Sequence, residues 1–97
     1  MNQQLINAIR NRRMIEFDYG DHRRIAEPHV YGLKDGTEQL LVFQVAGGSS
    51  SGGLPEWRRV DVPRMSGLSI LEDTFPGPRP NPSGRHSSWD QIYEKVT

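Results

Sequence analysis

The feature that most constrains the fold of this chain is a series of short strand-like runs, each closed by a turn. Residues 14–19 alternate apolar and acidic side chains at period two, as in a half-buried strand, and Gly20-Asp21 then marks a turn. Further runs with strand character follow at 23–31, 40–45, 56–62 and 65–71. Five strands at such short spacing predict a mainly β (α+β) domain, built as a small barrel or sandwich.

Glycine and proline indicate how these strands are connected. Asp35-Gly36 is a sequence typical of a tight hairpin turn. Pro28 predicts a sheet edge or a bulge, because proline cannot donate a hydrogen bond to a ladder. Pro63 marks a bend between the last two strands. The Gly/Ser run 47–53 predicts a flexible loop rather than a phosphate loop, since no Lys-Ser/Thr ending and no helix follow it.

Both ends of the chain have helical periodicity. At the N-terminus the predicted helix spans residues 2–13, with Asn2 as its N-cap and Arg10, Arg12 and Arg13 at the end where cations suit the helix dipole. At the C-terminus the predicted helix spans residues 87–97. Its apolar side chains fall at i, i+3, i+4 and i+7: Trp89, Ile92, Tyr93 and Val96.

Composition limits the possible partners. The 97 residues suit one domain, and 12 basic against 12 acidic residues give no global attraction to nucleic acid. Ten of the 12 basic residues are Arg, whose planar group pairs bidentately with phosphate or carboxylate. No cysteine is present, and no apolar run reaches the roughly 18 residues of a membrane span. We therefore expect a cytoplasmic protein without a membrane partner.

Two basic strand-like segments, residues 23–29 and 57–65, are the best candidates for a binding site. Side chains on a strand alternate between its two faces, so Arg23 and Arg24 lie on opposite faces. For the same reason Arg58 lies on the face opposite that of Trp57 and Arg59. A Trp and an Arg on one face can stack a base and hold its phosphate. The alternative is a solvated face of alternating Arg and Asp, which is ordinary on antiparallel sheets.

The sequence gives no sign of catalysis or of a metal site. The three histidines, His22, His29 and His86, lack the spacing of metal ligands. No cysteine nucleophile exists, and no serine lies in a G-x-S-x-G turn. We expect no enzyme, no cofactor and no metal.

The order of motifs resembles the WYL domain family over residues 5–72. The family pattern is a helix ending near Ala-Ile, an aromatic-x-Tyr strand, R-x-x-x-P, a Trp-Tyr-Leu strand and a closing R-x-F-R-x-D-R-I segment. The positions that match directly or conservatively are Ala8, Ile9, Tyr19, Arg24, Pro28, Leu40, Val60, Arg64 and Met65. The chain departs from the pattern at Glu38-Gln39-Leu40, which replaces Trp-Tyr-Leu, and at Pro63, which replaces the Asp.

The resemblance implies a small Sm-like (SH3-like) five-stranded β-barrel. With the composition and periodicity of the C-terminal part, we expect a barrel domain with its helix at 1–74, a Pro/Gly-rich linker at 75–86 and the C-terminal helix at 87–97. The resemblance also implies a regulatory module that binds a nucleotide or single-stranded nucleic acid. Its expected protein partner is either a second copy of the chain or a separate DNA-binding regulator.

By resemblance the ligand-binding residues are Tyr19, Arg24 and Arg64, together with Arg58 and Arg59. Trp57 is a further candidate, because it shares a strand face with Arg59. The alternative function is a structural or protein-interaction module, a homo-oligomer that assembles through the C-terminal helix and exposed strand edges.

Overall fold

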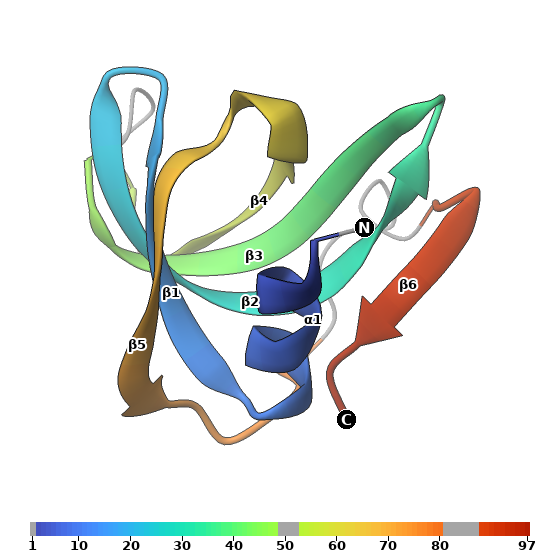
Figure 1. Ribbon diagram of the computed structural model, residues 1–97. Coiled ribbons are helices and arrows are strands. Elements are labelled where there is room, and N and C mark those ends of the chain that lie inside the picture. Colours follow the sequence, from blue (N-terminus) through green and yellow to red (C-terminus); the bar gives the residue numbers. More distant parts are fainter. Residues whose placement is uncertain (1, 49–52, 81–87) are drawn as a thin grey trace.

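The computed structural model describes residues 2–48, 53–80 and 88–97, which form an antiparallel sheet and a short helix (Figure 1). The strands are β1 (Arg13–Tyr19), β2 (His22–Lys34), β3 (Thr37–Gly47), β4 (Glu56–Asp61), β5 (Ser66–Thr74) and β6 (Gln91–Lys95). Helix α1 (Gln3–Arg10) precedes them, and the 3-10 helix η1 (Val62–Arg64) joins β4 to β5. The strand order is β4-β3-β2-β1-β5, with β6 also paired to β2. The prediction of a mainly β fold is confirmed.

Two tight turns set the register of the central strands. Asp35 and Gly36, with φ of 52° and 78°, connect β2 to β3, and Gly20, with φ of 62°, begins the turn between β1 and β2. Two successive positive φ values twist the chain in the direction that an antiparallel hairpin needs. Both turns predicted from the sequence are confirmed.

Pro28 interrupts the ladder between β2 and β3. The register shifts by one residue between the pair Pro28–Val42 and the pair Val30–Leu41, which is the predicted bulge. On its other edge β2 pairs with β1 at residues 22–26 and with β6 at residues 30–33. The long strand β2 therefore serves two neighbours along one edge, on either side of its bulge.

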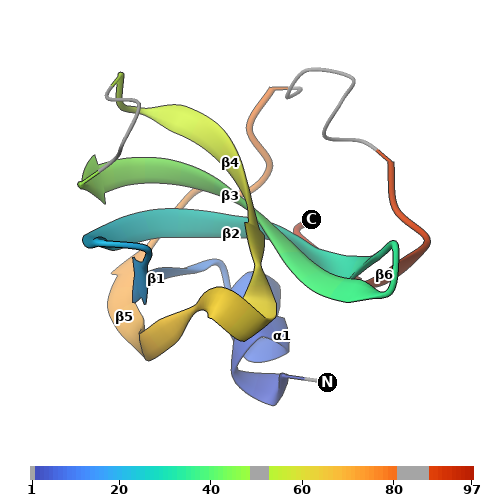
Figure 2. The same cartoon turned by 90° about the horizontal axis from the view of Figure 1, so that it is seen from above.

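The sheet is strongly curled, and its concave side holds the core. Figure 2 shows β2 and β3 sweeping past α1, which packs against β1, β2 and β6. This part of the core consists of buried apolar side chains from α1, the first four strands and the C-terminal segment: Leu5, Ile6, Ala8, Ile9, Ile15, Phe17, Ala26, Tyr31, Leu40, Val42, Val60 and Val96. Phe75, which follows β5, is also buried and stacks on His29 on the other side of the sheet. No ladder joins β4 to β5 in the described part of the chain, so the sheet is not a closed barrel.

The N-terminal helix is shorter than predicted. The Asn2 side chain accepts a hydrogen bond from the Leu5 amide at 3.2 Å, so the predicted N-cap is confirmed. The helix ends at Arg10, however, and Arg12 follows with a φ of 53°. Arg12 donates to the Thr97 carbonyl, and Arg13 already belongs to β1. The placement of these two arginines on the helix was wrong.

The predicted C-terminal helix is also wrong, because residues 91–95 form strand β6. A single short helix gains little stability by itself, whereas the free edge of β2 offers a row of backbone groups to pair with. Aromatic and β-branched residues suit such a strand. Tyr93 packs edge-on against Tyr31 with the ring centroids 5.1 Å apart, while Ile92 remains 47% exposed.

The segment predicted as a surface linker begins inside the packed structure. The Phe75 side chain is only 5% exposed, and the Phe75 amide donates to the Arg12 carbonyl at 3.0 Å. Residues 81–86 of the predicted linker and residue 87 of the predicted helix lie outside the described residues, as do residues 49–52 of the predicted Gly/Ser loop.

Candidate ligand-binding site

Four of the six predicted site residues lie near one another on the concave side of the sheet. Together with Gln44, which the sequence reasoning missed, they form what we call the Arg24 cluster. Its members are Tyr19, Arg24, Gln44, Arg58 and Arg64. They come from the end of β1, the start of β2, the last part of β3, β4 and η1. The curl of the sheet therefore brings together residues that are far apart in the sequence.

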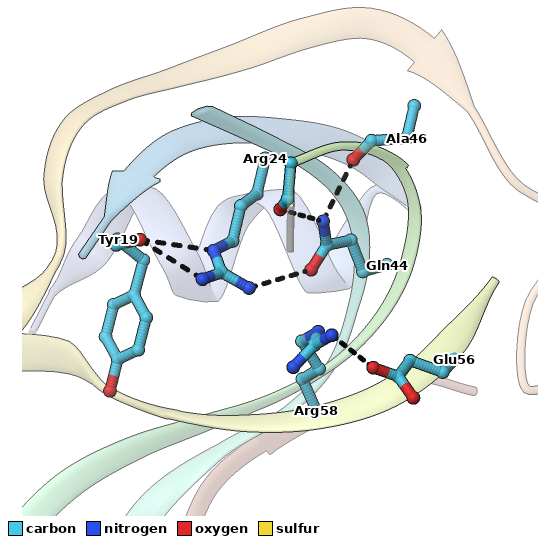
Figure 3. Close-up of polar contacts among 7 residues, drawn as sticks. Tyr19, Arg24, Gln44, Ala46, Glu56 and Arg58 are labelled. Atoms are coloured by element: carbon cyan, nitrogen blue, oxygen red, sulfur yellow. Dashed lines mark hydrogen bonds and ion pairs between the residues drawn. The ribbon is translucent and has the colours of Figure 1, made fainter. Parts of the chain in front are cut away.

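Arg24 is the buried centre of the Arg24 cluster, with 6% of its surface exposed. Its Nε and Nη2 atoms donate to the Tyr19 carbonyl at 3.3 and 3.2 Å, and Nη1 donates to Gln44 Oε1 at 3.2 Å (Figure 3). These three hydrogen bonds go to neutral oxygens. Burial lowers the pKa of Arg24, and the positive charge of Arg58 lowers it further. The protein thus holds a charged group in a place that disfavours the charge.

Gln44 positions Arg24 and orders the end of β3. Its side chain is fully buried, and Nε2 donates to the carbonyls of Ala46 and Gly48 at 3.1 and 3.0 Å. Gly47 has a φ of 93°, and a Cβ there would collide with the Arg23 carbonyl and lie 2.8 Å from the Arg24 Cα. Only glycine therefore fits beside the backbone of Arg24. Residues 47 and 48, predicted as part of a flexible loop, belong to this packed site.

Arg58 lies beside Arg24, with 20% of its side chain exposed. It forms an ion pair with Glu56 on the same strand. Figure 3 shows the Arg58 side chain rising from β4 toward Arg24 and Gln44. Two guanidinium groups thus lie close together on the inner side of the sheet, where burial weakens the screening by water.

Tyr19 connects the buried part of the Arg24 cluster to its exposed part. The guanidinium carbons of Arg24 and Arg64 lie 5.5 and 5.2 Å from the centroid of the Tyr19 ring, within the range of a cation–π contact. The Tyr19 hydroxyl accepts a hydrogen bond from the Asp61 amide at 3.0 Å, which fixes the ring. Arg64 is exposed, so the cluster includes a cation in contact with solvent.

Trp57 and Arg59 lie on the opposite, convex side of the sheet. The Trp57 ring packs edge-on against His29 at 4.7 Å and against Phe43 at 5.2 Å. The Arg59 guanidinium carbon lies 3.9 Å from the centroid of Trp89, and Nη2 donates to the Ser88 carbonyl at 2.7 Å. Trp57 and Arg59 share one strand face, as predicted. Other residues of the same chain already pack against both side chains.

Arg23, in the first basic segment, is also outside the Arg24 cluster. It forms ion pairs with Glu16 at 3.2 Å and with Asp18 at 3.0 Å, and it donates to the Gly67 carbonyl at 2.8 Å. Its charge is therefore balanced by two carboxylates. Arg24 has a different environment, although it is the next residue in the chain.

A metal site and a membrane-spanning helix are both absent from the described residues. No three His, Asp or Glu side chains gather there closely enough to hold a metal ion. No helix in the same part of the chain has both the length and the apolar character needed to cross a membrane.

Comparisons of the chain with family models, with curated proteins and with solved structures gave no match. The resemblance to WYL domains therefore remains a prediction from the residues quoted above.

Proposed function

We propose that this chain is a non-enzymatic regulatory module that resembles WYL domains and binds a phosphate-bearing ligand, either a nucleotide or single-stranded nucleic acid. In this proposal the curled sheet is an open form of the small Sm-like barrel of that family. The ligand contacts Arg24, Arg58 and Arg64, with Tyr19 beside them. The cytoplasmic location and the role in transcription regulation are parts of the same proposal.

The observation that carries the proposal is the environment of Arg24. Arg24 is 6% exposed, and its guanidinium donates to neutral oxygens and lies beside a second guanidinium, that of Arg58. Burying a charge costs several kcal/mol unless an opposite charge balances it. Arg58 is already paired with Glu56, so the unbalanced charge is that of Arg24. A phosphate bound beside Arg24 would supply that balance and would accept hydrogen bonds from the planar donors of Arg.

The geometry also supports a ligand that enters from the side of η1. Arg64 is exposed and lies 5.2 Å from the ring centroid of Tyr19, so it is the cation that a ligand would meet first. Tyr19 keeps Arg64 and Arg24 on the same side of the molecule. Cations that are already in place lose less side-chain entropy when the ligand binds.

Trp57 and Arg59 have no part in this proposal, although the sequence suggested them. Arg59 is stacked on Trp89, and Trp57 is packed between His29 and Phe43. A ligand would have to displace the C-terminal segment to reach Arg59.

A thermal-shift screen with mononucleotides, cyclic dinucleotides and short single-stranded oligonucleotides tests the proposal. A ligand at 100 times its Kd should add about 2.7 kcal/mol of stability. The shift should shrink in Arg64→Ala and persist in Arg59→Ala, which removes an arginine from the convex side. A screen in which no phosphate-bearing compound shifts the melting temperature would contradict the proposal, as would equal losses in the two variants.

The alternative function is assembly through the C-terminal helix and exposed strand edges. The helix face that suggested it is absent. Residues 91–95 form β6, and Val96 is buried. Mass measurement in solution with and without residues 88–97 still distinguishes assembly through strand edges from the ligand-binding role.

A further inference from the structure

The convex side of the sheet carries a second group of polar and aromatic residues, away from the Arg24 cluster. The group consists of Glu27 and His29 on β2, Phe43 on β3 and Trp57 on β4. We call it the Glu27 site. Figure 2 shows the chain after β5 passing on the side of β2 and β3 that faces away from α1. Residues 75–80 of that segment, which we call the strap, cover the Glu27 site.

Arg79 of the strap makes the contacts with the Glu27 site that a bound arginine ligand would make. Its Nε and Nη2 atoms donate to the two carboxylate oxygens of Glu27 at 2.6 and 2.8 Å. Its guanidinium carbon lies 4.5 Å from the ring centroid of Phe43. This combination of a bidentate carboxylate and an aromatic face is the chemistry that recognises a guanidinium group.

The Glu27 site has features of a receptor for arginine rather than of an ordinary surface ion pair. The Glu27 side chain is 5% exposed, whereas the Arg79 side chain is 41% exposed. A carboxylate buried in a strand requires a cationic partner, and the cation that provides it reaches in from an exposed segment. The hydrogen bond with Glu27 accordingly raises the pKa of Arg79.

The second anchor of the strap is Phe75. Its ring stacks on His29 with the centroids 5.3 Å apart and the planes 28° apart, and His29 contacts Trp57 edge-on. His29 Nδ1 lies 2.9 Å from the Glu27 carbonyl. His29 Nε2 is buried without a hydrogen-bond partner among the described residues. The site therefore takes an aromatic ring and, four residues later, an arginine.

The residues between the two anchors suit an extended peptide. Pro76, Pro78 and Pro80 are exposed, and residues 75–80 belong to no helix or strand. Proline restricts the backbone to extended conformations, so such a segment loses little entropy when it docks. Recognition by side chains in an aromatic-lined groove is the mode used for proline-rich peptides.

We propose that the Glu27 site binds an arginine within an extended, proline-flanked peptide that carries an aromatic residue four positions earlier. Arg79 fills the site from within the chain, and a peptide of the same chemistry from another protein fills it when the strap is displaced. Because the strap is tethered, its effective concentration is on the order of millimolar, and it excludes weaker competitors. This inference does not depend on the function proposed for the Arg24 cluster.

An NMR titration of the Arg79→Ala variant with a peptide of residues 74–80 tests the inference. The peptide should produce saturable shifts at Glu27, Phe43 and the Trp57 indole, and the wild-type chain should respond far less at the same concentration. Glu27→Gln in the Arg79→Ala background should weaken binding about tenfold or more, because it removes the charged acceptor. Methylguanidinium, used as a smaller probe, should shift the same residues at higher concentration.

Two further variants keep the result interpretable. Arg79→Lys retains the charge but loses the planar pair of donors, so the peptide should displace Lys more readily than Arg and bind this variant better than the wild type. Arg64→Ala, in the Arg24 cluster, should leave the titration unchanged. The inference is overturned if the peptide binds neither Arg79 variant, or if it binds equally well after Glu27→Gln.

Discussion

Replacing Arg24 with Met asks whether this buried cation stabilises the fold or serves a ligand. The change keeps an unbranched side chain and removes the guanidinium. Its cost is the loss of donors to the Tyr19 carbonyl and to Gln44 Oε1, and an unpaired buried acceptor costs about 1–3 kcal/mol. Its gain is that a charge beside Arg58 no longer has to be buried, which is worth several kcal/mol. We expect a free energy of unfolding within about 1 kcal/mol of the wild type.

Adding Gln44→Leu sharpens the test, because it removes one of the two acceptors that Arg24→Met leaves without a donor. The other acceptor, the carbonyl of Tyr19, belongs to a partly exposed residue and can bind water. Replacing both partners of a buried hydrogen bond with apolar residues of similar shape can be nearly neutral or stabilising. The carbonyls of Ala46 and Gly48, which also lose their donor, are partly exposed and can bind water. The double variant should therefore be at least as stable as the wild type while ligand binding is lost.

Urea denaturation measures both effects, and an unchanged m value shows that the unfolding transition remains comparable. A change of 1 kcal/mol corresponds to a shift of about 4–8 °C in Tm for a domain of this size. Arg23→Met is the matched control, because its partly exposed ion pairs should contribute less than about 1 kcal/mol each. A double variant that loses more than about 2 kcal/mol would refute the reasoning, since Arg24 and Gln44 would then hold the fold together.

Three other predictions follow from single buried groups. Burial lowers the pKa of His29 below 6.5, so just below that pH the folded state binds fewer protons than the unfolded state. The free energy of unfolding should therefore fall as the pH drops below 6.5, and it should fall less in His29→Gln. Burial and the hydrogen bond to Glu38 raise the pKa of Tyr31 from 10.0 to about 12, so stability should fall as the pH rises between these values, and Tyr31→Phe should flatten the slope of Tm against pH. A Cβ at Gly32 would collide with the Gln91 carbonyl, so Gly32→Ala should speed hydrogen exchange in β6 while the amides of β1 remain protected.

The local part of the fold could be predicted from the sequence. Asp35-Gly36 and Gly20 form turns because glycine and aspartate accept positive φ, and Pro28 forms a bulge because it lacks a donor. These outcomes depend on a few neighbouring residues. The period of the strands also predicted that Arg58 lies on the face opposite that of Trp57 and Arg59, as observed.

The parts that failed depend on contacts distant in the sequence. Residues 89–96 have a helical period, yet a free edge of β2 some sixty residues earlier decides their conformation. Arg59 and Trp57 resemble a stacking surface, but the C-terminal segment covers Arg59, and Trp57 packs against His29 and Phe43. Gln44 could have been noticed, because it follows Leu40 and Val42 on the inward face of the most apolar strand, where a polar residue requires a buried partner.

The central claim is that the Arg24 cluster binds phosphate, and the salt dependence of affinity tests it most directly. Fluorescence anisotropy with a labelled single-stranded oligonucleotide would give Kd over a range of salt concentrations. If Arg24, Arg58 and Arg64 each neutralise one phosphate, the logarithm of the association constant should fall against the logarithm of salt with a slope of about −2. Arg64→Ala should reduce that slope by about 0.7, and Arg59→Ala should leave it unchanged. The absence of saturable binding at low salt, or a slope that Arg64→Ala does not alter, would contradict the account.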